Sequence, residues 1–70
     1  MSREARTSKG TLVRLEMSDN TVVIRCGNIL SFGNITADDK AWIESMLDTF
    51  NLEETVDNIF RKIPMMRTAA

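Results

Sequence analysis

Two runs of alternating apolar and polar residues, separated by one turn signal, constrain the fold of this chain more than any other feature. The apolar positions of the two runs are Val13, Leu15, Met17 and Val22, Ile24, Cys26. Because successive side chains of a strand point to opposite faces of a sheet, each run predicts a strand with one buried face. Asp19-Asn20 predicts a two-residue turn between them. This turn places Met17 opposite Val22 and sets the register of a hairpin.

A second turn signal, Gly27-Asn28, is followed by a segment that predicts a third strand over Ile29 to Ile35. If the loop takes the three residues 27–29, Leu30 and Phe32 fall on the buried face of that strand. The sequence therefore allows either a hairpin or a three-stranded meander.

Two amphipathic helices are predicted after the strands. Thr36 and Asp39 have the spacing of a capping box, so the first helix begins at Ala37. Its apolar arc consists of Trp42, Ile43, Met46, Leu47 and Phe50. Asn51 repeats the capping signal, and a stripe in a new phase follows at Leu52, Val56, Ile59, Phe60 and Ile63. The second helix ends near Ile63 because Pro64 cannot continue a helix interior.

The predicted fold class is α+β, an antiparallel hairpin or three-stranded meander packed against two helices. We expect one small domain over residues 11–64. Residues 1–10 are rich in basic and poor in apolar side chains, which predicts a flexible basic arm. Residues 65–70 are expected to form a flexible tail.

The residue types needed for most catalytic and metal sites are missing from the chain. It has no histidine, no tyrosine and a single cysteine, Cys26, which is expected in the core. The acidic pairs Asp38-Asp39 and Glu53-Glu54 lie in first helical turns, where the helix dipole alone favours carboxylates. We therefore expect no enzyme, cofactor or metal. The longest uncharged stretch, residues 26–37, is too short to span a membrane, and a lone thiol fits the cytoplasm.

Charge is unevenly distributed along the chain, although the net charge is only −1. Residues 37–60 hold seven acidic side chains and one lysine, whereas residues 1–36 hold five basic and three acidic ones. An acidic helical surface of this kind favours a protein partner with a basic surface. Glu44 and Asp48 support this interpretation, because like charges four residues apart on a helix are unfavourable for the helix itself.

We therefore expect a small regulatory or inhibitory protein that self-associates as a homodimer and binds a protein partner through an acidic helical face and an apolar edge. The residues expected in that contact are Asp38, Glu44, Asp48, Glu53, Trp42, Met65 and Met66. Tryptophan and methionine are included because both are favoured at recognition surfaces. The alternative for Trp42 is a position that caps the core of the monomer.

A nucleic-acid-binding module is the alternative function. Its contacts with phosphate groups would come from the basic arm and the outer sheet face, through Arg3, Arg6, Lys9, Arg14 and Arg25. The sequence from Thr11 to Phe32 also resembles the first hairpin of Sm-type RNA-binding barrels. Asn20 stands where that motif usually has glycine, and two helical patterns replace the remaining strands, so the barrel is not the expected fold.

Overall fold

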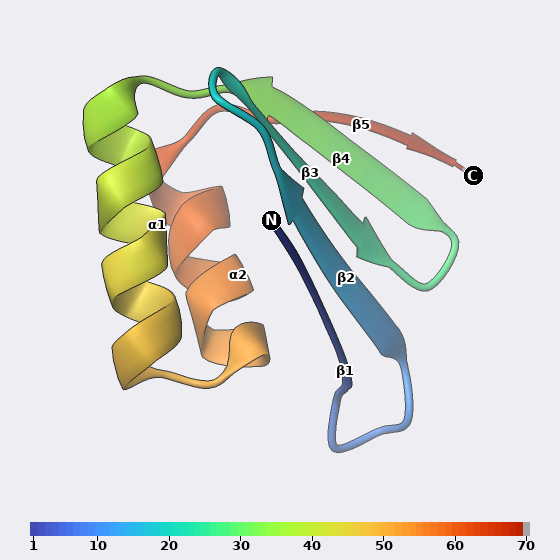
Figure 1. Cartoon of the computed structure of the whole chain (residues 1–70). Coiled ribbons are helices and arrows are strands. Elements are labelled where there is room, and N and C mark those ends of the chain that lie inside the picture. The colour runs from blue at the N-terminus through green and yellow to red at the C-terminus, as the bar shows by residue number, and fades with distance from the viewer. Residues whose placement is uncertain (70) are drawn as a thin grey trace.

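Five antiparallel strands form one sheet in the computed structural model, which describes residues 1–69. In spatial order the strands are β1 (Ser2–Arg6), β2 (Leu12–Met17), β3 (Thr21–Cys26), β4 (Ile29–Asn34) and β5 (Met66–Ala69). Helices α1 (Ala37–Thr49) and α2 (Leu52–Lys62) lie side by side against one face of the sheet (Figure 1). The predicted α+β class and the order of strands before helices are confirmed.

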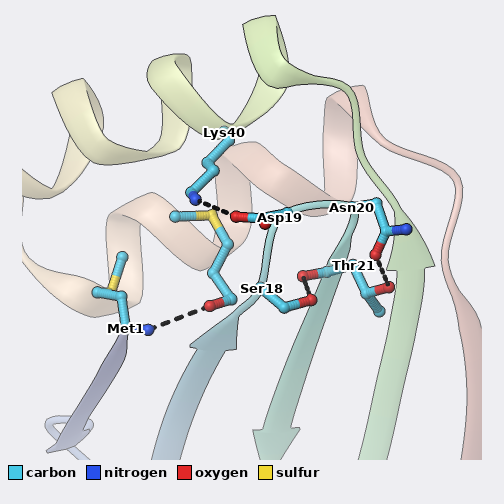
Figure 2. A network of polar contacts seen from close by, with 7 residues as sticks. Met1, Ser18, Asp19, Asn20, Thr21 and Lys40 are labelled. Atoms are coloured by element: carbon cyan, nitrogen blue, oxygen red, sulfur yellow. Dashed lines mark hydrogen bonds and ion pairs between the residues drawn. The ribbon is translucent and has the colours of Figure 1, made fainter.

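The hairpin of β2 and β3 has the predicted register, with Met17 opposite Val22 and Val13 opposite Cys26. The backbone N–H of Ser18 closes the turn by donating to the carbonyl oxygen of Thr21 at 2.9 Å. Asp19 and Asn20 form this turn without positive φ angles, which only glycine has among residues 1–69. Asp19 in the turn pairs instead with Lys40 of α1 at 3.1 Å (Figure 2), which ties the turn to the helical layer.

Both helices begin at side-chain caps that the sequence predicts. At α1 the backbone N–H of Asp39 donates to Thr36 Oγ1 at 3.1 Å, and the Asp39 carboxylate accepts from the Thr36 N–H at 3.2 Å. At α2 the backbone N–H of Glu54 donates to Asn51 Oδ1 at 2.8 Å. These bonds satisfy amide donors that a helix start otherwise leaves without a partner.

The core lies between the helices and the face of the sheet that they cover. Its buried apolar residues are Val13, Leu15, Met17, Val22, Ile24, Ile35, Ile43, Val56, Ile59 and Ile63. Leu15 and Ile24 of the sheet and Ile43 and Ile59 of the helices are fully buried. The alternating positions of β2 and β3 therefore bury one face of the sheet and leave the other in solvent.

The third predicted strand exists as β4, but its faces are reversed from the prediction. The turn between β3 and β4 takes two residues, because Cys26 pairs directly with Ile29. Gly27 has a φ of +59°, the left-handed conformation that such a tight turn requires at its first position. A loop shorter by one residue moves every side chain of the strand to the opposite face. Leu30 and Phe32 consequently lie on the outer face, and Ser31 is buried instead.

The segment predicted as a flexible basic arm forms strand β1, which pairs with β2 from Ser2↔Glu16 to Arg6↔Leu12. All five of its residues are exposed, so the strand is held by main-chain hydrogen bonds instead of by apolar burial. A turn with Gly10 at a φ of +83° joins it to β2. An edge strand of this kind leaves no hydrophobic periodicity in the sequence.

The segment predicted as a flexible tail contributes strand β5, which pairs with β4 from Phe32↔Met66 to Ile29↔Ala69. Helix α2 ends before Pro64 as predicted, and the chain then crosses close to Gly33 of β4. A Cβ atom at Gly33 would lie 2.7 Å from Met65 Sδ and 2.8 Å from the Pro64 carbonyl oxygen. The absence of a side chain at Gly33 therefore lets the chain reach the edge of β4.

Gly33→Ala is expected to lower the free energy of unfolding by about 1–3 kcal/mol, because the backbone carbonyl of Pro64 would have to shift to admit the new methyl group. Urea denaturation followed by circular dichroism measures the change. The control is Asn34→Ala at the exposed neighbouring position, which should change stability by less than about 0.5 kcal/mol. Equal stability of both variants would contradict the close approach of Pro64 and Met65 to Gly33.

Candidate interaction surfaces

The acidic residues of the two helices lie at the surface with little local compensation. Of the seven, only Asp39 has an ion pair among residues 1–69, with Lys62 at 4.0 Å. The four that the sequence analysis assigned to partner binding are all exposed: Asp38, Glu44, Asp48 and Glu53. We call these four residues the acidic helical face. Because no cation neutralises them within the described chain, their charge is available to a basic partner.

Of the three apolar residues expected in the partner contact, Trp42 and Met65 are half-buried. Trp42 is half-buried against the core, and the Nζ atom of Lys62 lies 4.2 Å from the centroid of its ring. Met65 also packs against the core. Met66 by contrast is 68% exposed on β5. Met66 is therefore the most accessible of the three residues.

The outer face of the sheet carries an apolar patch that the sequence analysis missed. Val23, Phe32 and Met66 lie directly beside one another across β3, β4 and β5, and Leu30 is adjacent on β4. We call these four residues the outer patch. Val23, Leu30 and Phe32 are half-buried, and both helices lie on the other face of the sheet (Figure 1). The pairing of Cys26 with Ile29 is what turns Leu30 and Phe32 outward.

The basic residues assigned to nucleic-acid binding are divided between two faces and a turn. Arg6, Arg14 and Arg25 lie on the outer face. Arg14 and Arg25 are opposite each other in the pairing of β2 with β3, and Arg6 is opposite Leu12, two residues before Arg14. Arg3 is opposite Leu15 and so lies on the helical side, while Lys9 is in the turn between β1 and β2. The structure therefore brings together three of the five residues.

Arg14 is also neutralised where it stands. Its Nε atom lies 2.9 Å from Glu16 and 4.0 Å from Glu4, both on the outer face. Arg25 instead donates to the Gly27 carbonyl oxygen at 3.3 Å. The charged half of the outer face thus has both signs and a weak net positive charge.

Two depressions mark the outer face. One, of about 190 Å³, is lined by Arg14, Glu16, Val23, Arg25 and Leu30. The second, of about 420 Å³, lies beside the N-terminal end of β1 and is widely open to solvent. Within residues 1–69 there is no group of three His, Cys, Asp or Glu residues placed to hold a metal ion. In the same residues no helix is long and apolar enough to cross a membrane.

Cys26 is half-buried at the end of β3, against the core. Burial raises the pKa of its thiol above the ordinary value of 9.0, and Asp57 raises this pKa further, while Arg67 opposes the shift. A pKa that is higher in the folded state means that the protonated thiol stabilises the fold below the unfolded pKa. This contribution is lost as the pH rises through the folded pKa.

The Cys26 thiol should react slowly with a disulfide reagent at mildly alkaline pH, because little of it is thiolate. Asp57→Asn should lower the pKa and increase the rate of modification, measured spectroscopically across a pH series. Glu53→Gln, one turn away on the same helix, is the matched control and should leave the rate unchanged. If Asp57→Asn also left the rate unchanged, Asp57 would have no influence on Cys26.

No family model matches the chain, and no curated protein or solved structure matches it either. The indications of function are therefore its own surfaces. Two of them differ from an ordinary solvated exterior: the acidic helical face, which lacks counter-charges, and the outer patch, which lacks a covering element.

Proposed function

We propose that this protein is a small non-catalytic regulatory protein that self-associates and binds a protein partner with a basic surface. The acidic helical face carries the proposal, because its carboxylates are exposed and have no ion pair among the described residues. Glu44 and Asp48 lie one turn apart on α1, an arrangement that costs helix stability when nothing offsets it. Cations of a partner would offset it.

The arrangement of the helices suits such a contact. Both helices lie on the same face of the sheet (Figure 1), so one flat partner surface can meet both helices. Complementary charge increases the rate of association and excludes partners of the wrong sign. A non-catalytic protein can regulate its partner by covering a surface that the partner needs for another ligand. Occlusion is therefore the proposed mechanism.

Self-association has separate support in the outer patch. Met66 is 68% exposed and continues a row of apolar side chains to the edge of the sheet. Contiguous apolar side chains at a surface are a feature of protein–protein interaction sites. Methionine also adapts well to a partner surface. The outer patch lies on the face opposite the helices, so the protein can self-associate and bind its partner at the same time.

Reversing the charge of Glu44→Lys and Asp48→Lys together should reduce capture of the partner from source cells at least about tenfold, because the basic surface would then face like charges. Quantitative mass spectrometry of proteins captured by the wild type and by the variant measures this loss. Circular dichroism establishes that the variant is folded. Increasing salt should weaken wild-type capture as well, since exposed charges are screened.

The matched control reverses Glu4→Lys and Glu16→Lys, which makes the same change in net charge on the outer face. Capture of the same partner should survive in this variant. If both double variants lose the partner equally, net charge matters and the acidic helical face does not. If neither loses it, binding occurs elsewhere and the proposed site is wrong.

A nucleic-acid-binding function is the second candidate, and Arg6, Arg14 and Arg25 on one open face support it. Fluorescence anisotropy with a mixed-sequence single-stranded oligonucleotide tests it at two salt concentrations. Binding that falls steeply with salt and is lost in Arg25→Glu would favour this function. The proposed protein-binding function instead predicts no binding under either condition.

A further inference from the structure

The two edges of the sheet differ in how well they are protected. Three of the five residues of β1 are charged: Arg3, Glu4 and Arg6. Charged side chains are the usual protection of an edge strand against pairing with another chain. Strand β5 at the other edge has one charged residue, Arg67, whose guanidinium carbon lies 4.7 Å from the ring centroid of Phe60. This contact holds the only charge of β5 against the helical layer.

The unprotected main chain of β5 can therefore accept another strand. It has no proline within it, all four of its residues are exposed, and one side of its backbone has no neighbouring strand among residues 1–69. Unpaired N–H and C=O groups in a row are a template for strand addition. Met66 lies at the same edge and contributes an apolar side chain to whatever binds there.

Charge distinguishes between the registers that a second copy of the same strand can take at this edge. Opposite residues of an antiparallel pair share a face of the sheet. A two-fold axis between two β5 strands must therefore place one residue of β5 opposite the same residue of the second copy. An axis at Arg67 sets two guanidinium groups opposite each other, which is unfavourable. An axis at Thr68 instead pairs threonine with threonine, a favourable combination, and sets Arg67 opposite Ala69. Of these two axes, charge and side-chain pairing both favour the one at Thr68.

We propose that two copies of this chain associate through antiparallel pairing of their β5 strands about a two-fold axis at Thr68. This inference rests on the self-association proposed above and specifies its geometry. The two five-stranded sheets become one continuous sheet. Both helical layers then lie on one side. On the other side the outer patches meet the joined edge only through Met66, which extends each patch onto β5. A four-residue strand buries less than the roughly 1,200 Å² of a standard interface, so the dimer is weak and concentration-dependent.

Sedimentation velocity across a concentration series tests the edge. The wild type should shift from monomer to dimer as the concentration rises, since a contact this small is weak. Thr68→Lys sets two like charges opposite each other at the axis and should weaken the dimer at least about tenfold. Ser2→Lys adds the same charge on the outer face at the opposite edge and should behave as the wild type.

Disulfide trapping tests the register and does not depend on weakening the dimer. At the axis the Cα atoms of two opposite residues lie about 4.5–5.5 Å apart, within the range of about 4.4–6.8 Å that a disulfide spans. Thr68→Cys in a Cys26→Ser background should therefore form a covalent dimer on mild oxidation, seen on a non-reducing gel. Ser2→Cys in the same background is the control and should remain largely monomeric.

A wild-type protein that stays monomeric at high concentration overturns the inference. So does a Thr68→Lys variant that remains a dimer, or a Thr68→Cys variant that is not trapped. These failures are distinguishable from failure of the partner-binding proposal, because capture of the basic partner depends on Glu44 and Asp48 and not on β5. A monomer that still captures the partner overturns the β5 pairing alone.

Discussion

Burial of one face of the sheet under the two helices is the contact on which the rest of the molecule depends. Leu15 and Ile24 from the hairpin meet Ile43 and Ile59 from the helices, and none of the four is exposed. Because the strand period is two, fixing these residues inward also fixes which residues point outward. The outer patch and the arginines of the outer face follow from that choice. The interaction surfaces are therefore consequences of the core.

Those parts of the fold that bury side chains could be predicted from the sequence. The register of β2 and β3 follows from apolar alternation and a two-residue turn, and the helices follow from caps and apolar stripes. Strands β1 and β5 could not be predicted, because every one of their residues is exposed and main-chain pairing leaves no side-chain pattern. Strand β4 was assigned the wrong face because its turn is one residue shorter than expected.

The candidate surfaces, like the fold, could be predicted from the sequence only in part. The acidic residues of the helices were predictable, because exposed helical positions follow from the period of 3.6 residues. Which of them form ion pairs could not be predicted, because this depends on contacts in three dimensions. Lys62, for example, lies beside Asp39 and over the ring of Trp42. The outer patch could not be predicted either. It requires the two-residue turn between β3 and β4 and the strand β5, which has no signal in the sequence. The surface composition was thus available from the sequence, while the neighbours of each residue were not.

The placement of acidic helices and arginine-bearing strands on opposite sides of the sheet gives the molecule an electric dipole across its layers. The shortest dimension of the molecule is 21 Å, whereas the field of a charge decays over about 8 Å at physiological ionic strength. An approaching molecule therefore senses one side at a time, and the small net charge of the chain does not describe what it meets. At an ionic strength of about 0.01 M the decay length is about 30 Å, and the two sides would largely cancel.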